Sequence, residues 1–256
     1  MGDLKPLIGI VGGVGVQAGI DLAEKISAET IAGSDQEHLP FVLLSRPDRI
    51  PDRTAYLLGT EPRNPAGALF ELLRDLETAG ATVAGIPCNT AHAEPIFGEI
   101  QKNLAKAGSR LKLIHMIRET MQFIRKHHPG IQRVGVLSTT GSYTVNLHAN
   151  FLTENGFTPV LPGAPTRIRV HAAIYHVTYG IKAQTYPIHP VAVEELHAAT
   201  AELKSLGAEA VILGCTEIPL ALPERVIDGM AAIDPARILA RALVKEVDAK
   251  KLKGMA

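Results

Sequence analysis

The chain has 256 residues, and its 26 basic and 26 acidic side chains give a formal net charge of zero at pH 7. This balance argues against a partner such as nucleic acid or an anionic membrane surface. No apolar run approaches the ~18 residues of a membrane span. Hydrophobic residues make up 46% of the chain, which can fill a sizeable core, so the length favours two lobes or one large α/β domain.

The first half of the chain alternates apolar runs of strand length with amphipathic stretches. A strand is predicted over Leu7–Val11, followed by a glycine turn and a helix near Ala18–Ile31. The further predicted elements are strands at Phe41–Leu44, Thr82–Ile86 and Leu111–His115, and helices at Pro65–Ala79 and Arg118–Lys126.

The series then restarts with a strand at Arg133–Leu137, followed by the turn Ser138–Ser142 and a helix. The remaining predicted elements are strands at Pro159–Leu161, Ala210–Leu213 and Met230–Ile233, a helix at Val191–Leu206, and a C-terminal helix. Two motifs keep nearly the same offset: Ile8–Val11 matches Val134–Leu137 after 126 positions, and Cys88 matches Cys215 after 127.

This internal duplication predicts an α/β fold of two pseudo-symmetric lobes. Strands separated by helices imply mostly parallel sheets flanked by helices. We assign residues 1–116 to the first lobe, 117–234 to the second and 235–256 to a C-terminal helix that could cross back onto the first lobe. Because ligands bind beyond the carboxyl ends of parallel strands, the active site is predicted in the cleft between the lobes.

Each of the two cysteines ends an apolar run, in the settings Ile86-Pro87-Cys88-Asn89-Thr90 and Leu213-Gly214-Cys215-Thr216-Glu217. A free cysteine often serves as a small core residue. Here both thiols precede predicted helix starts, where backbone N–H groups lower a thiol pKa. No metal-ligand spacing involves them. We therefore predict an acid/base pair acting on opposite faces of one carbon.

The residues after the thiols have two interpretations. Asn89, Thr90 and Thr216 could cap helices, and the same turns could bind a carboxylate. Glu217 could be an ordinary first-turn acid, or it could set the protonation of Cys215. His92, four residues after Cys88, suits a solvated or capping role as well as a catalytic one.

The glycine loop at 12–19 fits a dinucleotide fingerprint poorly, so Gly13 more plausibly lets the backbone approach a small anion. Thr140, in the turn that follows the first strand of the second half, is a candidate substrate contact. Arg53 and Lys182 are candidate cations on loops near the cleft, with Arg46 and Arg49 as the next choices. Surface charge is the alternative for each of them.

The chain resembles the cofactor-independent aspartate/glutamate racemase family in the motifs Ile8-Gly9-Ile10-Val11-Gly12-Gly13, Ile50-Pro51-Asp52-Arg53-Thr54, Pro87-Cys88-Asn89-Thr90-Ala91-His92, Gly180-Ile181-Lys182 and Gly214-Cys215-Thr216-Glu217. The resemblance implies two α/β lobes, a homodimer and a small amino acid substrate. Glu217 resembles the aspartate racemase branch, because glutamate racemases usually have His at this position. The first loop departs from the family's usual Gly-Gly-Met-Gly-Pro-x-Ala-Thr.

The resulting prediction is a cytoplasmic racemase of aspartate that needs neither cofactor nor metal. The expected catalytic residues are Cys88 and Cys215, with sulfur atoms roughly 6–7 Å apart across a closed cleft. The expected substrate-binding residues are Gly13, Arg53, Asn89, Thr90, Thr140, Lys182, Thr216 and Glu217. The alternatives are a glutamate or hydantoin racemase, a maleate isomerase, and a non-catalytic two-lobed small-molecule binding protein.

Overall fold

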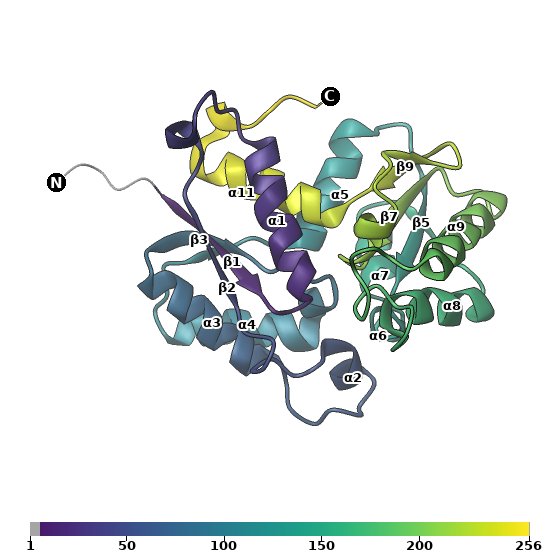
Figure 1. Ribbon diagram of the computed structural model, residues 1–256, viewed down its shortest axis with the longest axis horizontal. Coiled ribbons are helices and arrows are strands. Elements are labelled where there is room, and N and C mark those ends of the chain that lie inside the picture. The colour runs from purple at the N-terminus through teal and green to yellow at the C-terminus, as the bar shows by residue number, and fades with distance from the viewer. Residues whose placement is uncertain (1–5, 256) are drawn as a thin grey trace. The chain divides into compact units, whose positions relative to one another are not determined.

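A computed structural model describes residues 6–255, which form two compact α/β units (Figure 1). The described part of the first unit consists of residues 6–51, 63–119 and 236–255, and the second unit consists of residues 52–62 and 120–235. The predicted fold class, α/β with parallel sheets flanked by helices, is confirmed.

The first unit contains a parallel sheet in the order β2-β1-β3-β4. Its strands are β1 (Leu7–Gly12), β2 (Phe41–Ser45), β3 (Ala81–Gly85) and β4 (Lys112–Leu113). The central strand β1 is an apolar run because both of its faces are covered, as in other parallel sheets. β4 is shorter than the predicted strand at Leu111–His115.

Helices cover both faces of this sheet, with α3 and α4 on one side and α1 and α11 on the other (Figure 1). Their bounds are α1 (Val16–Glu29), α3 (Ala66–Thr78), α4 (Glu94–Lys106) and α11 (Pro235–Asp248). Leu239 and Leu243 of α11 lie against Gly85 of β3, and Glu29 of α1 pairs with Arg237 and Arg241 of α11. Short 3-10 helices are found at Asp35–Glu37, Thr90–His92 and Ala249–Lys251.

The second unit repeats the strand order of the first. Its sheet has the order β6-β5-β7-β9-β8, in which β6, β5, β7 and β9 are parallel and β8 is an antiparallel edge strand. The strands are β5 (Arg133–Ser138), β6 (Thr158–Val160), β7 (Ala210–Gly214), β8 (Val226–Ile227) and β9 (Met230–Ile233). β5 and β7 take the places of β1 and β3, so each cysteine follows the third strand of its unit along the chain.

Two longer helices of this unit, α8 (Ala164–Tyr175) and α9 (Pro190–Ser205), pack on each other and against β5. The shorter helices are α2 (Arg53–Leu57), α6 (Thr140–Thr144), α7 (Leu147–Glu154) and α10 (Ile218–Ala221). Helix α5 (Met116–His127) crosses the boundary between the two units. The sequence analysis did not predict α8, whose exposed Ile168 obscures its apolar face.

The boundary of the units differs from the predicted 1–116 and 117–234. Residues 52–62, which contain Arg53, belong to the second unit. The physical reason is that the Thr54 hydroxyl bonds to Thr139 at 3.4 Å and accepts a hydrogen bond from Tyr175 at 3.3 Å. Contacts between distant parts of the chain cannot be recognised from local composition, so the sequence did not predict this boundary.

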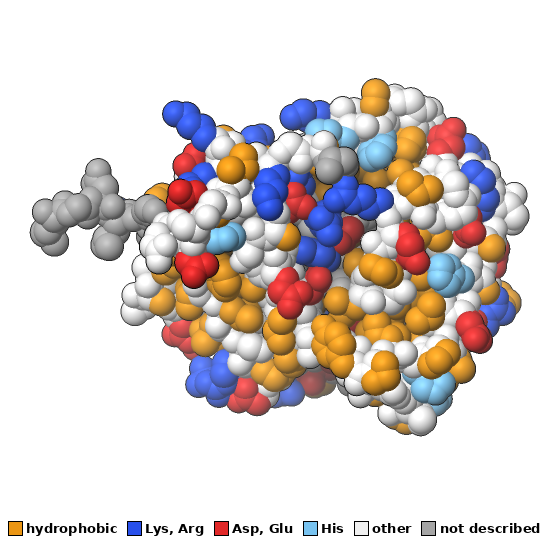
Figure 2. Space-filling view, turned by 45° about the horizontal axis from the view of Figure 1, so that its top comes forward, with side chains coloured by type: hydrophobic (Ala, Val, Ile, Leu, Met, Phe, Trp, Pro, Cys, Tyr) orange, Lys and Arg blue, Asp and Glu red, His pale blue; other side chains and the backbone are white. Residues whose placement is uncertain are grey.

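Charged side chains of both signs are interspersed with apolar ones on the face shown in Figure 2, in keeping with the zero net charge. None of the helices within residues 6–255 is long and apolar enough to cross a membrane.

Candidate active site

Cys88 lies in a tight turn directly after β3 and is 6% exposed. Its backbone N–H donates to the Ile86 carbonyl at 2.8 Å, and the chain then enters the 3-10 turn Thr90–His92. Asn89 and Thr90, both buried, come directly after the thiol. The side chain of Asn89 makes no capping hydrogen bond to this turn, so capping does not explain its presence.

His92 is 1% exposed, which rules out the solvated role considered from sequence. Its Nδ1 lies 2.9 Å from the carbonyl oxygen of Cys88. Burial lowers the pKa of His92 to about 4, against the opposing effect of the backbone at Cys88 and Ile114. The imidazole is therefore neutral at pH 7.

Gly13 has a φ of +82°, a left-handed conformation that glycine adopts without strain. A Cβ at this position would lie 2.7 Å from the backbone nitrogen of Pro47, so the loop also needs glycine for close packing. Helix α1 begins nearby with no side-chain cap and no acid in its first turn. Arg46 makes a two-point ion pair with Asp48, which occupies its guanidinium group.

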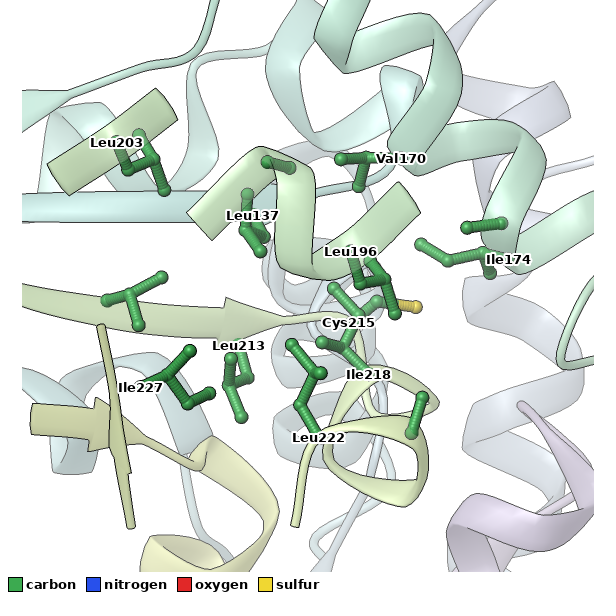
Figure 3. Close-up of a cluster of buried hydrophobic side chains, with 14 of the residues drawn as sticks. Leu137, Val170, Ile174, Leu196, Leu203, Leu213, Cys215, Ile218, Leu222 and Ile227 are labelled. Carbon is green, nitrogen blue, oxygen red and sulfur yellow. The ribbon is translucent and has the colours of Figure 1, made fainter. Parts of the chain in front are cut away.

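Cys215 follows β7 and is 8% exposed. It belongs to the buried apolar cluster of the second unit, and its sulfur is turned away from Leu203 and Ile227 (Figure 3). Gly214, the residue before it, packs against His148 of α7, where a Cβ would lie 2.8 Å from the imidazole carbon Cε1. This close approach explains why glycine precedes the thiol.

Three of the predicted site residues meet at Cys215. The Cys215 thiol donates to Glu217 Oε2 at 2.9 Å, and Lys182 Nζ pairs with Glu217 Oε1. The Thr216 hydroxyl, 3.4 Å from Glu217 Oε2, donates to the same carboxylate. Glu217 is 3% exposed and Thr216 is 1% exposed, so this polar group is enclosed by the protein.

The protonation states follow from these contacts. Burial raises the pKa of the Cys215 thiol well above its ordinary value, and the charge of Glu217 raises it further, while Lys182 opposes both. Burial would raise the pKa of Glu217, but Lys182 and the hydrogen bond from Cys215 hold it below its usual value. Burial would likewise lower the pKa of Lys182, but Glu217 raises it. At pH 7 the group is a thiol, a carboxylate and an ammonium.

Arg53 begins helix α2 and is 7% exposed, so it is a buried guanidinium and not an ordinary surface charge. The helix is capped by Asp52, whose carboxylate accepts from the Ala55 N–H at 2.7 Å. The Tyr175 hydroxyl contacts both neighbours of Arg53 in sequence, Asp52 at 3.5 Å and Thr54 at 3.3 Å.

The sequence analysis missed Tyr175 and His171, which connect several of these residues. Lys182 Nζ lies 5.4 Å from the centre of the Tyr175 ring, within the range of a cation–π contact. His171 stacks on Tyr175 at 4.7 Å, and its Nδ1 lies 3.2 Å from the Thr140 hydroxyl. Their i, i+4 spacing was the one available signal, because such residues share a helix face.

Within residues 6–255, no group of three or more His, Cys, Asp or Glu side chains could hold a metal ion. The structure thus places one thiol where it donates to an enclosed carboxylate and a second thiol in the equivalent turn of a repeated α/β fold.

The comparison with protein families identifies the class of protein. The sequence profile of the Asp/Glu/Hydantoin racemase family matches residues 11–243, so the chain belongs to this family. The resemblance noted from sequence and the prediction of an amino-acid racemase are confirmed. An uncharacterized protein of Pectobacterium carotovorum subsp. carotovorum is 30% identical over 124 residues, which is 48% of this chain and 77% of that protein.

Solved structures show the same fold. The aspartate racemase of Picrophilus torridus has 27% identity and a TM-score of 0.80, over 97% of this chain and 96% of that one. An aspartate racemase homologue from Pyrococcus horikoshii has 22% identity and a TM-score of 0.69, over 95% and 99%. A Francisella tularensis glutamate racemase in complex with D-glutamate has 16% identity and a TM-score of 0.64, over 98% and 84%. The last two likenesses concern the fold alone.

Proposed function

We propose that the chain racemises an acidic amino acid, aspartate, with Cys88 and Cys215 as the two acid/base groups. The observation that supports this most strongly is the hydrogen bond from the Cys215 thiol to the enclosed carboxylate of Glu217. A cysteine that only filled a core would not need a charged partner. Cys88 occupies the topologically equivalent turn, so both halves of the repeat contribute a thiol.

The proposed proton steps follow from the protonation of Cys215. As a thiol, Cys215 is ready to give a proton, so Cys88 acts first as the thiolate that removes the proton from the α-carbon. The C–H bond breaks and its electron pair remains on the α-carbon. Cys215 then delivers its proton to the opposite face of that carbon. The reaction ends with a Cys88 thiol and a Cys215 thiolate, and the reverse direction exchanges the two roles.

The carbanion must be stabilised by protein groups, because the proposed reaction uses no cofactor. We assign the α-carboxylate to Asn89, Thr90 and Thr216 and to the backbone at Gly13, where charge develops in the transition state. Arg53 and Lys182 are proposed to face the side-chain carboxylate, with Thr140 as a further contact. Lys182 also holds Glu217 as an anion, so its role is not limited to the substrate.

Aspartate is proposed as the substrate for two reasons. The Picrophilus torridus protein, 27% identical over nearly the whole chain, is an aspartate racemase. In addition, Glu217 follows Cys215-Thr216, which resembles the aspartate racemase branch. The reduced state of both cysteines suits the cytoplasm, and the family resemblance suggests a homodimer. Light scattering on the purified chain tests the dimer.

The function is tested with enantiopure aspartate, glutamate, alanine and a hydantoin in deuterated water. We expect loss of optical activity and incorporation of deuterium at the α-carbon, with aspartate preferred. If only glutamate or only the hydantoin exchanged its α-proton, the proposed substrate would be wrong but the proposed class of reaction would stand. Absence of exchange with all four compounds, although they bind, would indicate a binding protein and reject the proposal.

A further inference from the structure

Beside the Cys88 turn lies an aromatic cluster that the proposed mechanism does not use. It consists of His92, Phe97 and His115, and we refer to it as the His92 cluster. The ring of His92 is stacked on Phe97 at 4.9 Å, and His115 contacts both rings, at 4.9 Å from His92 and 4.5 Å from Phe97. The three residues come from the 3-10 turn, from α4 and from the connection between β4 and α5.

The hydrogen bonds of the 3-10 turn show which backbone group the His92 side chain contacts. The backbone N–H groups of His92 and Ala93 donate to the carbonyls of Asn89 and Thr90, at 2.9 and 3.2 Å. The carbonyl of Cys88 lies one residue earlier and faces Nδ1 of the His92 side chain. A carbonyl oxygen can only accept, so Nδ1 carries the proton and donates to Cys88.

The cluster leaves the His92 ring little freedom. The ring is 1% exposed, and Phe97 beneath it is 2% exposed. His115 is itself held in place, because its Nδ1 accepts a hydrogen bond at 3.3 Å from the backbone N–H of Arg118, near the start of α5. A buried ring held on its faces and donating to one carbonyl restrains the backbone of the residue that carries the thiol.

We propose that His92 is a positioning residue for Cys88, and that its Nδ1–H holds the turn in which the thiol can reach the α-carbon. This inference rests on the proposed function of Cys88. Its physical basis is that proton transfer depends steeply on geometry, since a misplacement of about 1 Å can cost roughly 100-fold in rate. His92 itself does not exchange a proton with the substrate.

The test separates the hydrogen bond from the ring. His92→Phe keeps an aromatic ring on Phe97 but removes the donor, whereas His92→Asn provides an N–H group near the position of Nδ1 but removes the ring. We expect His92→Phe to lower kcat by about 10- to 100-fold with KM within about 3-fold, as for a misplaced catalytic group. His92→Asn should recover most of the lost kcat.

The matched control is His115→Phe, which alters the same cluster without touching the bond to Cys88. We expect it to lower the melting temperature about as much as His92→Phe, with kcat within about 3-fold of the unmodified protein, since it changes the packing and the hydrogen bond from Arg118 but not the hydrogen bond to Cys88. A folded His92→Phe protein with unchanged kcat would overturn the proposal. So would equal losses of kcat in His92→Phe and His115→Phe.

A second measurement does not depend on racemisation. In a Cys215→Ala background, the rate at which iodoacetamide alkylates Cys88 reports directly on the presentation of this thiol. We expect His92→Phe to change that rate by at least about 3-fold and His115→Phe to leave it unchanged, because thiol reactivity follows the local environment. An unchanged rate in His92→Phe rejects the positioning role even if the protein has another activity.

Discussion

The surroundings of the two thiols differ although the strands that carry them occupy equivalent places. Cys215 has a charged environment, in which its proton is directed at Glu217 and Lys182 balances that carboxylate. In the Cys88 turn, the nearby imidazole of His92 is uncharged, and it bonds to the Cys88 backbone and not to the sulfur. The duplication has therefore kept the topology but not the electrostatics of the two turns.

This difference indicates that the two proton transfers are supported in different ways. In the proposed mechanism, burial and the charge on Glu217 keep Cys215 protonated, while His92 positions Cys88. In a racemase each group acts as the base in one direction and as the acid in the other. Two groups with different surroundings can therefore still complete one catalytic cycle. The predictions that follow test whether the asymmetry is functional.

The largest effect is expected from removing either thiol. Cys88→Ala and Cys215→Ala should each abolish racemisation of aspartate, because inversion needs a base on one face and an acid on the other. Each variant could still exchange the α-proton of one enantiomer, and the two variants should differ in which enantiomer that is. NMR of each enantiomer in deuterated water measures both effects. If either variant racemises aspartate at the rate of the unmodified protein, that cysteine is structural.

A smaller loss is expected at Arg53. Arg53→Lys keeps the charge but removes the planar fork that binds a carboxylate through two hydrogen bonds. Contacts of this kind are worth about 1.5–3 kcal/mol, so kcat/KM for aspartate should fall roughly 10- to 150-fold. The loss should be much smaller for a neutral amino acid such as alanine, if that reacts.

The control for Arg53 is Arg74→Gln. Arg74 pairs with Glu77 within α3 and belongs to none of the predicted site motifs. Arg74→Gln should leave kcat/KM for aspartate and for alanine within about 2-fold of the unmodified protein, as expected for an exposed ion pair. Equal losses for aspartate and alanine in Arg53→Lys would assign Arg53 to the α-carboxylate or to the scaffold instead of the side chain.

The comparison of the two thiols is sharpened by Glu217→Gln, which removes the charge with little change of shape. Since the carboxylate raises the pKa of Cys215, this variant should lower it, and Lys182 without its partner should lower it further. The midpoint of Cys215 alkylation against pH, measured in a Cys88→Ala background, should fall by about one unit or more. The alkylation midpoint of Cys88, measured in a Cys215→Ala background, should be the same with and without Glu217→Gln.

The effect of Glu217→Gln on activity should be a roughly 10-fold loss of kcat and a shift of the pH–rate profile to lower pH, because general acid/base efficiency depends on the pKa of the donor. An unshifted alkylation midpoint would mean that Glu217 does not control the proton of Cys215. The two thiols would then differ only in their packing.

Much of this arrangement could be predicted from sequence, because its signals are local. The repeat of Ile8–Val11 at Val134–Leu137 indicated the repeated α/β topology, and the two Cys motifs indicated equivalent turns. The apolar positions Leu69, Leu72, Leu73 and Leu76 predicted α3 to within one residue at each end.

Other parts could not be predicted, since they depend on contacts between distant residues. Lys182 and Glu217 are 35 residues apart, and no pattern in either motif shows that they form an ion pair. The contact of Tyr175 with Thr54 joins positions 121 residues apart and places the Arg53 helix in the second unit. His92 was noted from sequence, but its burial and its bond to Cys88 depend on Phe97 and His115 around it.

The smallest predicted effect concerns stability, and it tests whether the histidines beside Cys88 are uncharged in the folded protein. Burial lowers the pKa of His92 to about 4, and burial together with His92 and Arg118 lowers the pKa of His115 to about 2. In the unfolded chain both groups titrate near 6.5. Between these values the unfolded state binds more protons than the folded state, so stability rises with pH and falls as the pH is lowered from about 6.5.

From pH 6.5 to pH 5, each buried neutral histidine should remove about 1–2 kcal/mol from the free energy of unfolding. Urea denaturation at several pH values measures this slope, and the window lies above the range in which most carboxylates titrate. His92→Phe should flatten the slope by the contribution of one histidine. If the slope of His92→Phe equals that of the unmodified protein, His92 carries a proton in the folded state, and the contrast between a neutral Cys88 turn and a charged Cys215 turn is lost.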